Sequence, residues 1–283
     1  MSIKLMIDSA SDISKEEASK LGIYFVPMEI RFNDEEYLDG DTLSASEFYT
    51  KLVETSDLPK TSQINPFRWE EEFKKATENG DNLIVITISS KLSGTYQSAV
   101  KASKNFDGKV FVVDSMNACI GERLLCQYAM QLIKENNLSI TEIVARLNEV
   151  KSKINVMAIL NTLKYLKKGG RISAVTAIAG EVFSIKPVIG VVNGEVKLIG
   201  KAMGSKKGNN LLNNLVEKKG GIDYSMPFGV VWSGNDKFLL NKYVEDSSHL
   251  WKDHVDKVPE YIIGSTIGTH IGPGGVGVAF FEK

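Results

Sequence analysis

The sequence has 283 residues, of which 43% are hydrophobic, and its 34 basic and 35 acidic side chains give a formal net charge of −1. This length allows two domains or one large domain, and the composition is that of an ordinary globular chain. A nearly neutral chain has no overall attraction to nucleic acid or to anionic lipid, so neither is expected as a partner. Two cysteines and three histidines exclude a disulfide framework and leave little room for a metal site.

The first residues contain neither a long apolar run nor a small-residue cleavage site, so we predict no signal peptide. No stretch of about 18 apolar residues occurs that could cross a membrane. The protein is therefore expected to be cytoplasmic, without stable membrane insertion. The unusual feature of the composition is its 24 glycines, several of which fall within the last twenty residues.

The first half of the chain alternates strand-like and helix-like patterns. Apolar, β-branched runs predict strands, whereas capping boxes at Ser44 and Ser139, together with Pro66, mark helix starts. This alternation is typical of a parallel sheet covered by helices, so residues 1–155 are predicted to form a Rossmann-like α/β domain. Strands are expected at residues 3–7, 23–32 (interrupted at Pro27), 83–88 and 110–113, and helices at residues 66–79, 96–105 and 119–135 and after each capping box.

The second half has a different texture. Asn193-Gly194 between apolar runs predicts a type I′ hairpin, because both central residues of that turn need positive φ angles. The paired glycines at 169–170 are expected to end a short helix. We therefore predict an α+β domain over residues 156–283. Strands are expected at residues 156–160, 228–232 and 276–281, and helices at residues 163–168 and 206–218.

Residues 89–96 place a cluster of hydroxyl side chains directly after the expected strand at 83–88. Ligands of open α/β sheets bind beyond the carboxyl ends of the strands, and hydroxyls at a helix N-terminus suit an anion. The same pattern also suits a simple N-cap by Ser90 or Ser93. Residues 59–63, taken alone, predict only a turn. From these residues alone, the anion site and the N-cap both remain open.

The glycines of residues 272–277 match the letters of the dinucleotide-binding fingerprint. That fingerprint needs a strand before it and a helix after it, whereas a strand-like apolar run follows here. Tight backbone turns around His270 explain these glycines better than a nucleotide site does. The cations of residues 167–171 are expected to complement the dipole at the C-terminus of their helix.

A hydrolase is an alternative, because serine, histidine and aspartate are all present. The GxSxG nucleophile elbow is absent, and Ser233 stands in a Trp-Ser-Gly context instead. A triad is defined by geometry, so the sequence leaves this alternative open. His249 and His254 are five residues apart, a spacing that does not place two ligands on one helix face, and we predict no metal site.

Several segments, in order along the chain, resemble segments of the DegV family. Residues 88–96 (ISSKLSGTY) resemble its SSxLSGTYxSA segment, and residues 163–172 (LKYLKKGGRI) resemble its LxYLxKGGRI segment. The matches run from the first expected strand to the last ten residues and so cover the whole chain. The other matching segments are residues 7–13, 60–63, 113–115, 185–189 and 268–274.

The resemblance implies a two-domain protein that holds one long-chain fatty acid, of roughly C14–C18 such as palmitate, in an apolar tunnel between its domains. Burying about sixteen carbons at roughly 0.8 kcal/mol per methylene gains on the order of 12 kcal/mol before the costs of association. The carboxylate would be presented to a separate fatty acid kinase, which makes an acyl phosphate. The chain itself would be a carrier and not an enzyme, with no cofactor.

By position, the resemblance assigns the carboxylate to Thr61 and Ser93, with His270 close by. Ser62 and Gly94 flank them and would add backbone N–H donors. Such donors are needed because a buried carboxylate without them is costly. The alternative is a hydrolase or acyltransferase that uses Ser93 or Thr61 with His270, and it would need an acid oriented toward the imidazole.

The resemblance also implies that Arg171 lies at the surface that faces the kinase. Relatives often carry an arginine where this chain has Met203. If that arginine helps to dock the kinase, docking here would be weaker or would use other residues.

Overall fold

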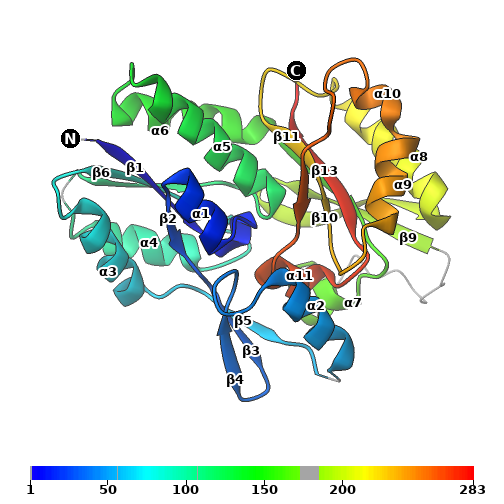
Figure 1. Cartoon of the computed structure of the whole chain (residues 1–283), viewed down its shortest axis with the longest axis horizontal. Helices are drawn as coiled ribbons and strands as arrows, with labels where there is room; N and C mark the ends of the chain where they lie inside the picture. The colour runs from blue at the N-terminus through cyan, green and yellow to red at the C-terminus, as the bar shows by residue number, and fades with distance from the viewer. Residues whose placement is uncertain (1, 56, 107, 173–184) are drawn as a thin grey trace.

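The computed structural model describes residues 2–55, 57–106, 108–172 and 185–283. Within these ranges the strands form a parallel sheet, a mixed sheet and a small antiparallel sheet. The two larger sheets lie side by side, and the green helix α5 (Ile120–Glu135) lies between them (Figure 1). The predicted α/β class is confirmed.

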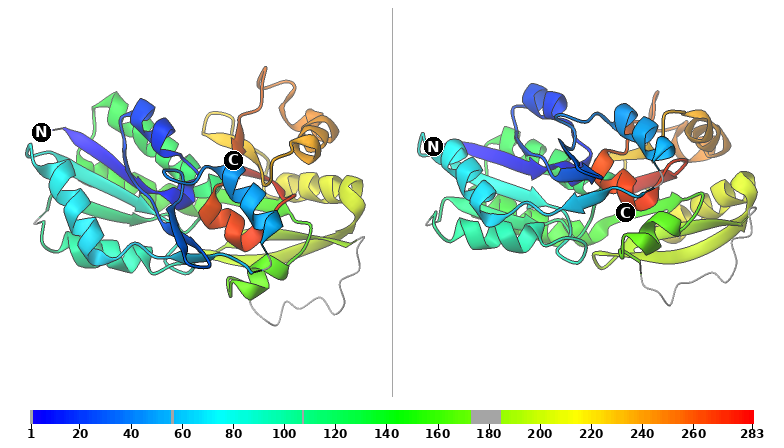
Figure 2. Two further views of the ribbon diagram at one scale, coloured as in Figure 1. Left: turned by 60° about the horizontal axis from the view of Figure 1, so that its bottom comes forward. Right: turned by 90° about the horizontal axis from the view of Figure 1, so that it is seen from below.

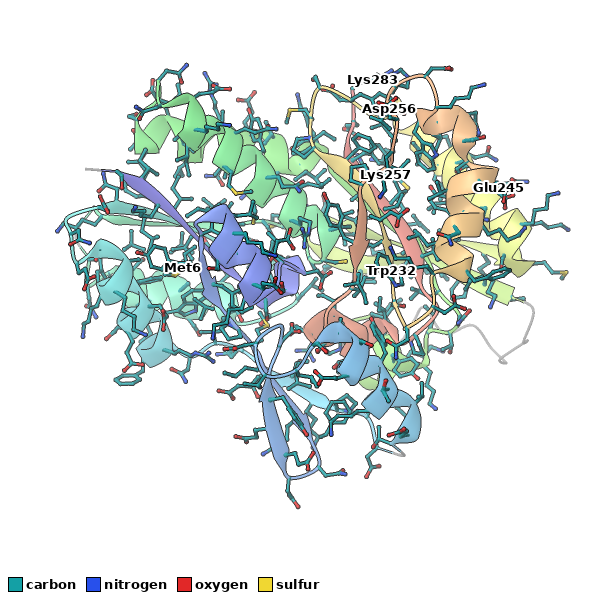
Figure 3. The ribbon with its side chains drawn as sticks, in the orientation of Figure 1. Met6, Trp232, Glu245, Asp256, Lys257 and Lys283 are labelled. Atoms are coloured by element: carbon teal, nitrogen blue, oxygen red, sulfur yellow. The ribbon has the colours of Figure 1, made fainter. Side chains whose placement is uncertain are left out.

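The parallel sheet has the strand order β2-β1-β6-β7. Met6, labelled in Figure 3, and Leu83 face α3 and α4, whereas Leu5 and Ile7 face the helices of the opposite layer. Because both faces are covered, the strands are nearly continuous apolar runs, and the parallel pairing predicted for this sheet is confirmed. The sheet consists of β1 (Ile3–Asp8), β2 (Tyr24–Val26), β6 (Asn82–Thr87) and β7 (Val110–Asp114), and its layers include α1 (Lys15–Leu21), α3 (Pro66–Thr77), α4 (Thr95–Ser103), α5 and α6 (Ile140–Val150).

The mixed sheet has the strand order β10-β9-β8-β13-β11-β12, with antiparallel neighbours except for β11 and β12. One face packs on α8, α9 and α10. The other face packs on α5, which therefore belongs to the cores of both large sheets. The elements are β8 (Ile154–Ile159), α7 (Lys164–Lys168), β9 (Ile185–Val192), β10 (Glu195–Met203), α8 (Gly204–Lys218), β11 (Phe228–Trp232), α9 (Phe238–Asp246), α10 (Ser248–Trp251), β12 (Glu260–Ile262), α11 (Ser265–Ile271) and β13 (Val276–Phe281).

The two large sheets divide along the chain at the start of β8, at Ile154. The helices do not follow that division. α5 packs on both sheets, and α11 of the second half packs against α2 (Ala45–Glu54) of the first half, as both views in Figure 2 show. A domain boundary between residues 155 and 156 therefore stays a prediction.

The small sheet has the order β4-β3-β5 and was not predicted. The turn expected at residues 59–63 is wrong, because Thr61 pairs with Ile30 of the neighbouring strand. A three-residue strand depends on its partner and leaves no period of its own in the sequence. The strand expected at residues 23–32 divides near Pro27 between the parallel sheet and this one. The small sheet contains β3 (Glu29–Phe32), β4 (Glu35–Leu38) and β5 (Lys60–Ser62).

Signals that act within a few residues are confirmed. Ser44 Oγ accepts a hydrogen bond from the Glu47 amide at 3.3 Å and begins α2, and Ser139 begins α6 in the same way. Asn193 and Gly194 have φ angles of 52° and 82°, as a type I′ hairpin turn requires.

The hairpin tip at Gly194 packs against the loop that follows β6. Ser89 Oγ donates a hydrogen bond to Gly194 O at 2.8 Å, and a Cβ on Gly194 would lie 2.6 Å from that hydroxyl oxygen. We expect Gly194→Ala to lower the free energy of unfolding, measured in urea. The left-handed backbone of an alanine there costs about 1–2 kcal/mol, and the clash of its Cβ with Ser89 costs roughly a further 1–3 kcal/mol.

The matched control is Gly220→Ala. Gly220 has a φ of +85°, and among the described residues no heavy atom lies within 4 Å of where its Cβ would stand. This variant should show the strain alone. Equal losses in the two variants would contradict the packing of the hairpin tip on Ser89.

Candidate functional site

A cavity of about 260 Å³ lies beyond the carboxyl end of β6, where the two halves of the chain meet. Its lining combines polar side chains with a larger apolar surface. The five residues predicted to bind a carboxylate all line it: Thr61, Ser62, Ser93, Gly94 and His270. The apolar walls are Met28, Ile88, Leu92, Ala118, Leu166, Val196, Ile267 and Ile271.

Thr61 and His270 form the contact that joins the halves at this cavity. Thr61 Oγ1 lies 3.1 Å from His270 Nε2, across 209 residues of sequence. β5 holds Thr61 through its pairing with Ile30, and α11 holds His270 in its last turn. The ring also packs on Gly169, where a Cβ would lie 2.2 Å from Nδ1. Glycine at 169 is therefore required by the position of the imidazole.

Burial, together with the nearby positive charge of Arg171, lowers the pKa of His270 to about 4. The imidazole is therefore neutral at pH 7, with one N–H donor and one acceptor nitrogen. His270 Nδ1 is buried and has no hydrogen-bond partner in the described part of the chain. A neutral ring with a single proton can donate one hydrogen bond to an anion in the cavity.

Ser93 lies in the segment between β6 and α4. Its Oγ is 2.9 Å from Thr95 Oγ1 and accepts a hydrogen bond from the Thr95 amide at 3.3 Å. Ser93 lines the cavity, but the N-cap of α4 is Gly94, without a side-chain cap. The N-cap predicted at Ser90 or Ser93 is therefore wrong. Ser90 does not line the cavity; its amide donates to Asp114 at 3.2 Å.

Gln63 also lines the cavity and was not predicted as a site residue. Its Nε2 donates to Ser98 Oγ at 3.2 Å, and a Cβ on Gly94 would lie 1.9 Å from its Oε1. Gly94 is therefore needed for the amide side chain to cross over the start of α4. The available signal was the long polar side chain of Gln63 next to two candidate ligands.

Arg171 lies at the edge of the cavity and is exposed. Its Nε donates to Leu92 O at 3.3 Å and its Nη1 to Gly169 O at 2.7 Å. Arg171, Thr61 and His270 also line a neighbouring cleft of about 920 Å³. The charged residues of that cleft are Arg31, Lys60, Lys168 and Arg171, opposed by Asp34 and Asp57.

The glycines of residues 272–277 lie between a helix and a strand, the reverse of the order in a dinucleotide site. Gly272 and Gly274 have φ angles of 71° and 79°, which confirms tight turns there. His270 itself belongs to α11, a helix that was not predicted. The turns therefore follow His270 and do not surround it, because helix α11 positions the imidazole.

Other kinds of site find no support in the described ranges. No group of three or more potential metal ligands occurs there. No acid orients the His270 ring, since Nδ1 lacks a partner there. No helix in those ranges has the length and apolar character to cross a membrane.

Comparison with known proteins identifies relatives along the whole chain. The model of the DegV family, described as an uncharacterised protein family, matches residues 2–283. A DegV domain-containing protein from Caldanaerobacter subterraneus is 33% identical over 283 residues, which is 99% of each chain. A structure from Thermus thermophilus, described as fatty acid binding of a DegV family protein, has 30% identity and a TM-score of 0.88, with 100% of both chains covered.

A DegV family structure from Eubacterium eligens, loaded with heptadecanoic acid, has 25% identity and a TM-score of 0.84, again with 100% of both chains covered. The similarity thus holds for sequence and fold alike, over both sheets and the cavity between them. Because the family model and a relative above 30% identity both span essentially all residues, this chain belongs to the DegV family.

Proposed function

We propose that this chain binds a long-chain fatty acid of roughly C14–C18, with its carboxylate at Thr61, Ser93 and His270. The observation that carries the proposal is the Thr61–His270 contact at 3.1 Å on the edge of an apolar cavity. Fatty acid binding by the Thermus thermophilus relative and the heptadecanoic acid held by the Eubacterium eligens relative support it.

The donors at this site suit a carboxylate that must remain reactive. The hydroxyls of Thr61 and Ser93 and the neutral imidazole of His270 offer hydrogen bonds, and we propose that the backbone amides of Ser62 and Gly94, which also line the cavity, add to them. Such bonds offset the desolvation of the anion. None of these donors carries a full charge, so the carboxylate keeps its nucleophilic character.

A long acyl chain needs apolar space beyond the residues proposed to bind its carboxylate. A second cavity of about 570 Å³ begins at Asn117 and Gly194, close in sequence to Ala118 and Val196 of the first. We infer that the end of the acyl chain extends toward this second cavity. Its apolar walls include Met116, Val156, Met157, Ile199 and Leu215.

We further propose that the carrier presents the carboxylate to a separate fatty acid kinase and catalyses nothing itself. The cleft beside Arg171 supports this, because it gives a partner access to the carboxylate end of the site. Its cations would attract the phosphoryl donor of the kinase. Met203 is 60% exposed at the end of β10. We propose that the cations of the cleft serve in place of the arginine that relatives often carry at this position.

A hydrolase or acyltransferase that uses Ser93 or Thr61 with His270 is less well supported. An imidazole with a pKa of about 4 is a weak general base at neutral pH. The absence of an orienting acid at Nδ1 in the described ranges points the same way.

The first test is extraction of the purified protein with organic solvent, followed by mass spectrometry. We expect about one C14–C18 fatty acid per chain and at least a tenfold loss of retained lipid in Ser93→Ala, whose fold should stay intact by circular dichroism. Ser90→Ala is the matched control, since Ser90 does not line the cavity, and it should retain lipid normally. Equal retention by both variants would remove Ser93 from the site.

The second test concerns the partner. Arg171→Ala should keep its lipid, because Arg171 bonds two backbone carbonyls at the edge of the cavity, but its lipid should be phosphorylated several-fold more slowly. The measurement is the rate of acyl phosphate formation with a fatty acid kinase and labelled ATP. Lys167→Ala, exposed in the preceding helix α7 and outside the cleft, is the control. An unchanged rate for Arg171→Ala would rule out its role in presentation.

The third test uses the imidazole as a reporter. A bound carboxylate stabilises the protonated ring, so lipid loading should raise the pKa of His270 from about 4 toward its ordinary value. Proton NMR titration of delipidated and loaded protein measures the change. His249, exposed in α10, is the internal reference, and its resonances should not respond to lipid. A His270 pKa that does not move on loading would place the carboxylate elsewhere.

A further inference from the structure

Helix α11 forms one side of the proposed lipid site, through Thr266, Ile267 and His270. Its N-cap residue is Gly264, which has no side chain to bond the free amides of the first turn. A buried helix start needs other partners for those amides. The helix has only seven residues, so its own hydrogen bonds hold it weakly.

Two carboxylates from the first half of the chain bond these amides. Asp39 Oδ1 accepts from the Ser265 amide at 2.9 Å, and its Oδ2 accepts from the Thr266 amide at 3.2 Å. Asp12 Oδ1 accepts from the Gly264 amide at 2.8 Å. The partners are 226 to 252 residues apart in sequence. The start of α11 is therefore held from outside its own segment.

Asp39 is only 2% exposed, and burial raises its pKa, although the bonds from Ser265 and Thr266 oppose that rise. In the described ranges its carboxylate meets amide donors in place of a cation. The positive end of the helix dipole favours the carboxylate further. Because a buried charge without donors is costly, Asp39 and the docked position of α11 stabilise each other.

Asp39 is itself fixed with respect to the cavity. Its amide donates to Met28 O at 3.0 Å, and the Met28 amide donates to Ser9 Oγ at 3.0 Å at the end of β1. His270 follows Ser265 by five residues, or about 7.5 Å along the helix axis at 1.5 Å per residue. A displacement of the helix start would therefore be carried directly to the imidazole.

We propose that Asp39, assisted by Asp12, is a positioning residue for the carboxylate site, which holds α11 so that His270 stays in hydrogen-bond reach of Thr61. Neither aspartate lines the 260 Å³ cavity. This inference rests on the proposed function for its effect on lipid. Its effect on the imidazole does not depend on any ligand.

The test is Asp39→Asn in the full chain. The change keeps the size of the side chain but replaces one carboxylate oxygen with an NH₂ group. That group is a donor and cannot accept the hydrogen bond from the Ser265 or Thr266 amide. In delipidated protein, we expect the pKa of His270 to rise from about 4 toward its ordinary value, because a loosened ring is better hydrated. We also expect at least a tenfold weaker affinity for palmitate, measured by fluorescence displacement.

The matched control is Asp41→Asn. Asp41 is two residues away and pairs with Lys15 at 2.9 Å near the surface. It should leave both the imidazole titration and the palmitate affinity unchanged. A general loss of stability does not change the pKa of a histidine in the folded state, so the titration separates positioning from a purely structural role.

Each outcome has a definite meaning. A folded Asp39→Asn protein with an unchanged His270 pKa overturns the proposal. If Asp39→Asn does not fold, Asp12→Asn is tested in its place, since it disturbs only the bond from the Gly264 amide. We then expect a smaller rise in the pKa of His270, and an unchanged pKa in that variant also overturns the proposal. If the unaltered protein binds no palmitate while Asp39→Asn still moves the titration, the proposed function fails and the positioning role stands.

Discussion

The close packing of α11 against its neighbours is the constraint on which the site depends. A Cβ on Gly268 would lie 2.6 Å from the Phe48 ring, and one on Gly272 would lie 2.3 Å from the ring of Tyr165. Phe48 is buried in the core around α2 and cannot move away easily, and the partly buried Tyr165 packs against that core. α11 can pack this closely on α2 and α7 only because Gly268 and Gly272 have no Cβ atom. The glycine excess in the composition is thus partly a requirement of this one interface.

α5 adds a second link between the halves. Arg123 is 2% exposed, pairs with Glu17 through two bonds and donates to the carbonyl oxygen of Asp12. Its guanidinium also lies over the Tyr261 ring at 4.2 Å. A buried cation with partners in both halves favours one relative arrangement of them. The cavity at their junction therefore has a defined shape.

The sequence predicted those elements whose signals are local. Capping at Ser44, the Asn193 turn and the buried runs of the parallel sheet each need only a few neighbouring residues. α11 lacks such signals, because its caps come from Asp12 and Asp39, more than 220 residues earlier. β5 was missed for the same reason. Thr61, Ser93 and His270 were found through the family resemblance, whereas Gln63, whose role depends on packing over Gly94, was not.

The place of β13 in the mixed sheet has a consequence for biosynthesis. β13 follows every other described strand in the chain, yet it lies between β8 and β11 and pairs with both. While a ribosome is still making the preceding residues, β8 and β11 lack this partner and expose open edges, which are prone to wrong pairing. α11 directly precedes β13 and lines the cavity, so the cavity closes in the same late step. A nascent chain would therefore complete this cavity only after its most aggregation-prone stage has passed.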